Sequence, residues 1–142
     1  MRLSAWAAVT LGLLIAAPAV AQAQDTTAAP PTVQLHRNYP NPFNPETTIP
    51  FSLDRSLWSS GRPPVVSLRI YNILAQLVAV PILQGTGELL DNVSLVWNGT
   101  GDYAGYWDGK VLGTNREAAS GVYVYQLTVN GKTVSKKMTI VK

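Results

Sequence analysis

The sequence predicts an all-β fold, an immunoglobulin-like antiparallel β-sandwich of about seven short strands. Apolar and polar residues alternate with a period of two in several short segments, which is the pattern of half-buried strands. Residues typical of turns separate these segments, and no long segment shows the 3.6-residue period of a helix. A small β-barrel is the competing architecture.

Two segments in the first half of the chain show this alternation most clearly. Residues 48–53 carry apolar side chains at every second position, which indicates a strand with one apolar face. Because Pro50 has no N–H to donate to a neighbouring strand, we expect this strand at the edge of its sheet. Residues 66–71 alternate more regularly still and predict a second strand.

Turn-forming residues and prolines divide the middle of the chain. Asn72–Gln76 has the composition of a turn. In the segment that follows, Leu77–Leu83, Pro81 indicates another edge strand or a β-bulge. The glycine-rich stretch Asn98–Gly121 is long for a plain loop, so we expect a short extended piece near Tyr103–Trp107.

The last segment predicts a β-hairpin. Gly121–Val129 and Lys132–Val141 are rich in β-branched residues, and Asn130-Gly131 between them suits a two-residue type I′ turn. Lys136 shares the parity of the apolar Met138. We therefore expect either a bulge at positions 136–137 or a lysine that reaches solvent from an edge strand.

The N-terminus predicts export. Met1–Ala23 has a basic residue, an apolar run and small residues before two candidate cleavage sites, after Ala21 or after Ala23, as in a secretory signal peptide. Gln24–Arg37 is expected to be a flexible leader, and Asn38–Lys142 to be the sandwich. The mature chain is then extracellular or at the cell surface, with the periplasm as its place of transit.

Composition excludes several classes of partner. The net charge of +3 is too small to predict nucleic-acid binding, and the absence of cysteine excludes thiol chemistry and most structural zinc sites. The charge is uneven, however, because four lysines and no acidic residue follow Glu117. These lysines are Lys132, Lys136, Lys137 and Lys142.

The residues do not predict an enzyme, a cofactor or a small-molecule substrate. The one histidine, His36, is expected to be a solvated loop residue. Ser120 lacks the flanking glycine of a nucleophile elbow, and no spacing indicates paired carboxylates or a phosphate-binding loop. No catalytic residue is therefore assigned.

A calcium site is the one metal hypothesis. Asn98, Asp102 and Asp108 offer oxygen ligands within a glycine-rich stretch, although their spacing matches no EF-hand loop. Turn formation explains the same residues. Asn98 also begins a glycosylation sequon by its letters alone.

Aromatic residues of the second half could form a carbohydrate-binding surface. Their strand parity favours core packing for most of them. The residues concerned are Trp97, Trp107, Tyr123 and Tyr125.

Five segments occur in an order that resembles a known family. They are "NYPNPFNPETTIPFSL" (Asn38 to Leu53), "VSLRIYNILAQLV" (Val66 to Val78), "WDG" (Trp107 to Gly109), "ASGVYVYQL" (Ala119 to Leu127) and "KKMTIVK" (Lys136 to Lys142). Together they resemble the C-terminal sorting domain (type A) of proteins exported by the type IX secretion system. They are also similar to the immunoglobulin-like domain of the flagellar hook-capping protein.

The resemblance covers about Leu35 to Lys142 and implies a β-sandwich that the outer-membrane secretion machinery recognises. It further implies that recognition involves the lysines of the basic terminal strand. The family motif falls on Asn38, Pro40, Asn41, Pro42, Phe43, Asn44, Pro45, Trp107, Asp108, Gly109, Ser120, Gly121 and Tyr123. A free-standing structural or adhesive surface subunit, capable of self-assembly, is the alternative function.

Two local expectations accompany the resemblance. The family usually has glycine where this chain has Ala75, so we expect that turn to avoid positive φ. The proline-rich segment is expected to be a rigid lead-in that closes the first edge of the domain, with Tyr39 and Phe43 packed onto one end of the sandwich.

Overall fold

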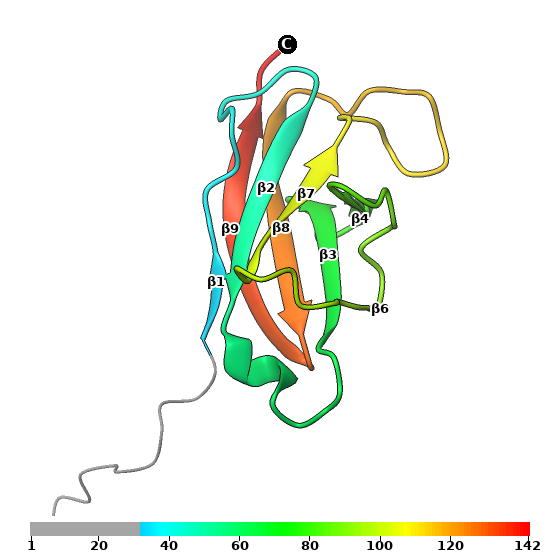
Figure 1. Ribbon diagram of the computed structural model, residues 1–142. Helices are drawn as coiled ribbons and strands as arrows, with labels where there is room; N and C mark the ends of the chain where they lie inside the picture. Colours follow the sequence, from blue (N-terminus) through cyan, green and yellow to red (C-terminus); the bar gives the residue numbers. More distant parts are fainter. Residues whose placement is uncertain (1–31) are drawn as a thin grey trace, which may run out of the picture.

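The computed structural model describes residues 32–142, which form two antiparallel sheets packed face to face (Figure 1). The first sheet has the order β1 (Val33–Leu35), β2 (Thr47–Leu53), β7 (Asp102–Trp107) and β5 (Ile82–Leu83). The second has the order β4 (Leu77–Ala79), β3 (Val65–Asn72), β8 (Gly121–Val129) and β9 (Lys132–Ile140). β6 (Val93–Ser94) pairs with β3, and a short 3₁₀ helix, η1, spans Arg55–Trp58.

The predicted all-β sandwich is confirmed, and the strands form two separate sheets rather than a closed barrel. There are nine strands in the described part of the chain instead of about seven, because two of them contain only two residues. The expected signal peptide and most of the leader lie outside the described residues. No helix within residues 32–142 is long and apolar enough to cross a membrane.

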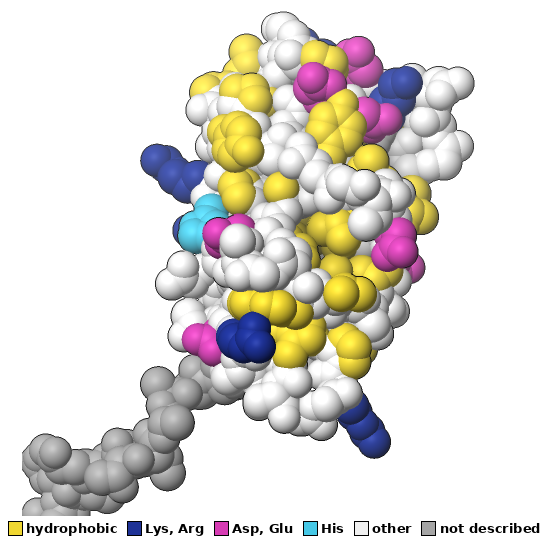
Figure 2. Space-filling view, in the orientation of Figure 1, with side chains coloured by type: hydrophobic (Ala, Val, Ile, Leu, Met, Phe, Trp, Pro, Cys, Tyr) yellow, Lys and Arg dark blue, Asp and Glu magenta, His cyan; other side chains and the backbone are white. Residues whose placement is uncertain are grey.

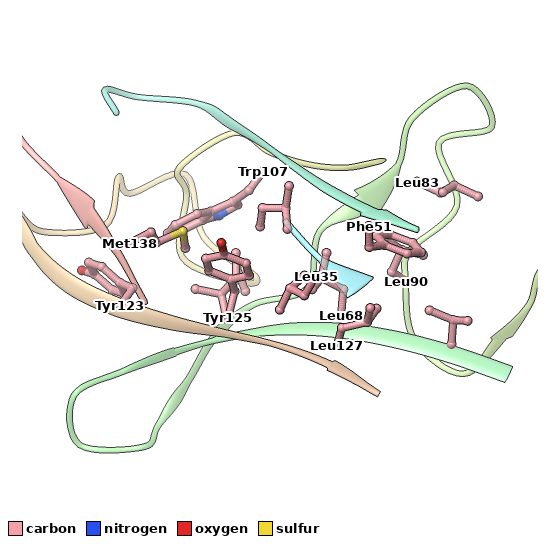
Figure 3. Packing of buried hydrophobic residues seen from close by; sticks show 14 of the residues in the cluster. Leu35, Phe51, Leu68, Leu83, Leu90, Trp107, Tyr123, Tyr125, Leu127 and Met138 are labelled. Carbon is pink, nitrogen blue, oxygen red and sulfur yellow. The ribbon is translucent and has the colours of Figure 1, made fainter. Parts of the chain in front are cut away.

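The core lies between the inner faces of the two sheets (Figure 3). Burial alternates residue by residue along β2 and along β8, as the period of a strand requires. Leu68 of β3 and Leu127 of β8 are fully buried, and Leu35 of β1 packs close to them from the opposite sheet. β1 thus adds core contacts from within residues 24–37, which were expected to form a leader.

The expectation that the Pro50 strand lies at an edge is wrong. β2 lies between β1 and β7, and Pro50 stands one position beyond the last residue pair that joins β2 to β1. His36 N–H donates to the Pro50 carbonyl (3.0 Å), but Pro50 has no N–H with which to return the bond. The Tyr125 hydroxyl donates to the His36 carbonyl instead (2.8 Å), so a core tyrosine replaces the missing donor.

Pro81 lies where the chain passes from one sheet to the other. The residues before it belong to β4 and those after it to β5, and both strands lie at sheet edges. Pro81 therefore agrees with the edge prediction. Leu112 N–H donates to the Val78 carbonyl of β4 (2.8 Å), so the loop after β7 covers part of the β4 edge.

The Asn72–Gln76 turn departs from expectation because Ala75 has φ +61°. Asn72 fixes this geometry, since its Oδ1 accepts from the amides of Leu74 (3.0 Å) and Gln76 (2.9 Å). The prediction that Ala75 would avoid positive φ is therefore wrong. Two hydrogen bonds accepted by one asparagine side chain hold the turn in a conformation that glycine would adopt without strain.

The C-terminal hairpin is confirmed. Asn130 and Gly131 both have positive φ (+48° and +84°), as a type I′ turn requires. The pairing of β8 with β9 runs without a shift from Val129–Lys132 to Gly121–Ile140, so there is no bulge at positions 136–137. Lys136 instead reaches solvent from the edge strand β9.

Ala75→Gly should raise the free energy of unfolding by about 0.5–1 kcal/mol, because glycine removes the cost of a left-handed alanine. Urea denaturation measures the change. Ala104→Gly, in the middle of β7, is the control and should lower stability by a similar amount. A loss of stability at both positions would contradict the strain at Ala75.

Candidate recognition surface

Segments far apart in the sequence meet at one end of the sandwich. We call this end, around Phe43, Trp107, Tyr123 and Met138, the motif end. Phe43 from the proline-rich loop (Asn38–Pro45) is buried, and its ring meets Trp107 edge-on with ring centroids 5.5 Å apart. Trp107 meets Tyr123 in the same way at 5.9 Å. Met138 of β9 lies beside these rings (Figure 3). The residues of the expected motif therefore surround a buried aromatic centre.

The proline-rich loop continues the second sheet at this end. Phe43 N–H donates to the Thr139 carbonyl (3.1 Å), and Val141 N–H donates to the Phe43 carbonyl (3.2 Å). Thr139 N–H donates to Asn41 Oδ1 (3.1 Å). The loop thus pairs with the last residues of β9 and closes that edge, rather than the edge of the first strand.

Phe43 packs onto the end of the sandwich as expected, but Tyr39 does not. The Tyr39 side chain is 59% exposed, although its backbone forms a bridge with Thr48. Asn38 is buried nearby, where its Nδ2 donates to Thr47 Oγ1 (3.1 Å) and its backbone N–H donates to the Tyr125 hydroxyl (3.2 Å). Buried polar contacts therefore anchor the start of the loop.

The Trp-Asp-Gly turn and the proline-rich loop touch at Gly109. Gly109 has φ +82°, and a Cβ added to it would lie 1.9 Å from the Pro45 carbonyl oxygen. Asp108 Oδ1 accepts from the Lys110 amide (3.0 Å) and holds the turn. Only glycine allows the backbone at position 109 to lie this close to the Pro45 carbonyl. This contact gives a physical reason for the Trp-Asp-Gly turn and the proline-rich loop to occur together.

The C-terminus is fastened on its other side by the segment before β8. Lys142 N–H donates to Ser120 Oγ (3.1 Å), and Lys142 Nζ lies 3.2 Å from Glu117 Oε2. Gly121 begins β8 next to this contact and pairs with Ile140. The end of the chain is therefore held between the proline-rich loop and the segment before β8.

The members of the motif divide into buried and exposed residues. Asn38, Phe43, Trp107, Gly109 and Tyr123 are buried and shape the motif end, and Gly121 is half-buried. The exposed members form its surface, and they are Pro40, Asn41, Pro42, Asn44, Pro45, Asp108 and Ser120.

The four C-terminal lysines do not form one cluster. Lys132 lies at the hairpin turn, and Ile140 lies at the other end of β9. At the rise of an antiparallel strand, these two residues are about 27 Å apart. Lys136 and Lys137 lie between these points and Lys142 is at the motif end. All four are exposed, so they form a basic line along β9.

The calcium candidates are not brought together. Asp102 begins β7 and Asp108 follows its end, which places them about 20 Å apart at the rise of a strand. Asn98 Oδ1 accepts from the Gly101 amide (2.8 Å), and its Nδ2 donates to the Asp102 carbonyl (2.6 Å). These bonds hold Asn98, the first residue of the sequon, in a turn.

The aromatic residues divide in the same way. Trp107, Tyr123 and Tyr125 are buried in the core, as their parity predicted. Trp97 is half-buried near η1, where its ring meets Trp58 at a centroid distance of 4.9 Å. The Arg55 guanidinium lies 5.1 Å from the Trp97 ring centroid, so a cation covers this aromatic pair.

A Ser-His-Asp row crosses the outer face of the first sheet, and no local pattern in the sequence indicates it. His36 Nε2 lies 2.8 Å from Ser52 Oγ, and Ser52 Oγ donates to Asp102 Oδ1 (2.7 Å). The serine stands between the other two residues, whereas a catalytic triad has histidine in the middle. With the hydroxyl proton directed at a carboxylate, this row joins strands and does not activate a nucleophile.

No protein-family model and no curated protein sequence matches the chain. Among solved structures it is similar to part of the Pseudomonas fluorescens alkylpurine DNA glycosylase AlkC bound to DNA containing an abasic site analogue. The sequence identity is 17% and the TM-score is 0.46, over 78% of this chain and 30% of that one. The chain thus spans less than a third of the length of that protein, and a likeness at this level carries no functional argument.

Gly109→Ala should lower the free energy of unfolding by about 2–4 kcal/mol, because the new Cβ meets the Pro45 carbonyl and the left-handed backbone is strained. Gly99→Ala is the matched control. Gly99 also follows a Trp-Asx pair and has φ +93°, but nothing lies within 4 Å of an added Cβ. We expect that control to lose only about 1–2 kcal/mol. Equal losses in urea denaturation would contradict the close approach of turn and loop.

Stability should fall as the pH rises above about 10, the ordinary pKa of tyrosine. Burial raises the pKa of Tyr103, Tyr123 and Tyr125, and a hydrogen bond to the Glu46 carboxylate raises the pKa of Tyr106 to about 12. The raised pKa values mean that the folded state favours the neutral phenols. Their contribution to stability is therefore complete below the pKa of tyrosine in the unfolded chain, and it is lost as the pH rises towards the pKa in the folded chain. Denaturation midpoints in urea between about pH 8 and pH 11 measure the loss.

Tyr106→Phe tests whether tyrosine ionisation causes the loss of stability. The substitution removes one phenol with a raised pKa and leaves the core intact. The fall above pH 10 should be shallower in this variant. An unchanged fall would show that other groups cause it.

Proposed function

We propose that this chain is a non-enzymatic recognition module, a sorting domain that directs export across the outer membrane and attachment to the cell surface. The observation that supports the proposal most is the assembly of the family motif. Residues between Asn38 and Tyr123 meet the C-terminal residues at one end of the sandwich. This gives them a shared structural role that their sequence positions alone do not explain.

The proposed mechanism is docking of a preformed surface. Asn38, Phe43 and Gly109 are buried and set the shape. The exposed residues of the proline-rich loop are Pro40, Asn41, Pro42, Asn44 and Pro45. Because the proline-rich loop is tied to β9 by backbone hydrogen bonds, little conformational entropy is lost when a partner binds it. The lysines of β9 add attraction to an acidic partner and would speed its encounter.

One observation favours the alternative, a structural or adhesive subunit that self-assembles. Ile73 and Leu74, at the tip of the β3–β4 turn, are 76% and 73% exposed, and Leu77 and Val122 are also exposed. Apolar side chains presented in this way can join copies of a chain. Sedimentation at increasing protein concentration separates the two functions, because the sorting domain should stay monomeric.

A reporter fused in front of residues 32–142 should appear outside the cell only when the host has the outer-membrane translocon. The fusion starts at Thr32 because β1 belongs to the sandwich. Replacing all four C-terminal lysines by glutamine should leave most of the reporter in the periplasm, whereas Lys→Arg at the same positions should not. Substitution is the cleaner test because truncation from Lys136 would also remove Met138 and Ile140 from the core.

Cell fractionation with immunoblotting measures the distribution of the reporter. Export of the glutamine variant at the level of the arginine variant would remove the lysines from the mechanism. Export without the translocon would contradict the proposed function itself.

A further inference from the structure

The outer edge of β9 is paired along only part of its length. Thr139 is held by Asn41 and Phe43 near the motif end. Towards the hairpin turn, no backbone hydrogen bond within residues 32–142 reaches the outward side of Thr133, Ser135 or Lys137. We call this part, residues 132–137, the open edge.

The register shows which backbone groups are free at the open edge. Val129–Lys132 closes a two-residue turn, so it is a hydrogen-bonded pair, and every second pair after it bonds across to β8. The residues between those pairs point their N–H and C=O groups outward. Thr139 confirms this parity, because both of its backbone groups bond to the proline-rich loop. Ser135 and Lys137 share the parity of Thr139 and are exposed.

The neighbouring strand leaves this edge open. β1 lies alongside β9 in Figure 1 but forms no strand pair with it. Thr133, Ser135, Lys136 and Lys137 all keep exposed side chains beside it. β9 therefore has unpaired backbone groups along its open edge. A further strand can be added only to an edge of this kind.

Basic side chains flank the open edge on both faces of the sheet. Lys136 has the inward parity of Met138, and Lys137 points from the outer face. Arg37 adds positive charge close by, because it follows His36, whose carbonyl accepts from the hydroxyl of Tyr125, the residue paired with Lys136. On the face drawn in Figure 2, one basic side chain projects from the left margin beside the histidine, which is His36, the one histidine of the chain. No ion pair within residues 32–142 involves Lys132, Lys136 or Lys137.

These charges decide which strand can pair. Two copies of this edge repel one another, because lysines on an edge strand, an inward-pointing one above all, oppose edge-to-edge association. An acidic strand meets attraction instead. We propose that the open edge of β9 is a strand-addition site for an extended acidic segment of a partner protein. This proposal depends on the proposed function in one respect: the acidic segment would belong to the export machinery.

A synthetic peptide tests the site directly. A fluorescent peptide of alternating glutamate and threonine, about ten residues long, should bind the full chain saturably, and a peptide with lysine for glutamate should not. Fluorescence anisotropy measures the affinity. Binding of the acidic peptide should weaken as ionic strength rises towards 1 M, where screening is effective beyond about 3 Å.

Substitutions separate backbone pairing from charge. Ser135→Pro removes an outward N–H without touching the ladder to β8 and should abolish binding, while Ser135→Ala, which keeps that N–H, should bind like the wild type. Lys136→Glu should weaken binding about tenfold. Arg62→Glu, the same charge change in the exposed loop before β3, should have no such effect.

Hydrogen exchange keeps the test decisive if Ser135→Pro does not fold. The amides of Thr133, Ser135 and Lys137 should exchange rapidly in the free chain and become protected when the acidic peptide binds. Protection of these amides in the free chain would overturn the proposal, because another copy or another part of this chain would then cover the edge. Equal binding of the acidic and basic peptides would also overturn it.

The peptide assay does not involve export. Peptide binding at the open edge together with translocon-independent export would leave this site standing and refute the proposed function. Absence of peptide binding together with translocon-dependent export would refute the site alone.

Discussion

The insertion of Phe43 between the sheets is the contact on which the motif end depends. Its ring meets Trp107. Its backbone N–H donates to the Thr139 carbonyl on the last strand, and its carbonyl accepts from the Val141 N–H just after that strand. One residue thus joins the proline-rich loop to both the aromatic core and the C-terminus. Removal of the ring would leave a cavity under Trp107, and loss of the backbone bonds would free the end of β9.

Alternation predicted the strands well because it reflects burial on one face, and the paired segments 66–71 and 121–129 show it clearly. It could not place Pro50, because the position of a strand within its sheet depends on partners elsewhere in the chain. The Tyr125 hydroxyl that makes a central proline tolerable lies 89 residues from His36. No local pattern carries that information.

The same limit applies at the site. The motif residues were found from their order in the sequence, but the contact of Gly109 with Pro45 and the row formed by His36, Ser52 and Asp102 needed the fold. Ala75 shows a related case, since Asn72 supplies hydrogen bonds that outweigh a backbone preference. Tyr39 and Phe43 are both aromatic residues of one proline-rich segment, and only the fold shows that Phe43 reaches Trp107 while Tyr39 stays exposed.

The central claim is that the proline-rich loop and the C-terminal strand form one structural unit. Hydrogen exchange in a Phe43→Leu variant tests it most directly, because leucine keeps an apolar side chain and removes the ring that anchors the loop. The account predicts faster exchange at the Thr139 and Val141 amides, with the Leu68 and Gln126 amides in the middle of the sheet unchanged. Unchanged protection at Thr139 and Val141 would contradict it, since the end of the chain would then be held without the loop.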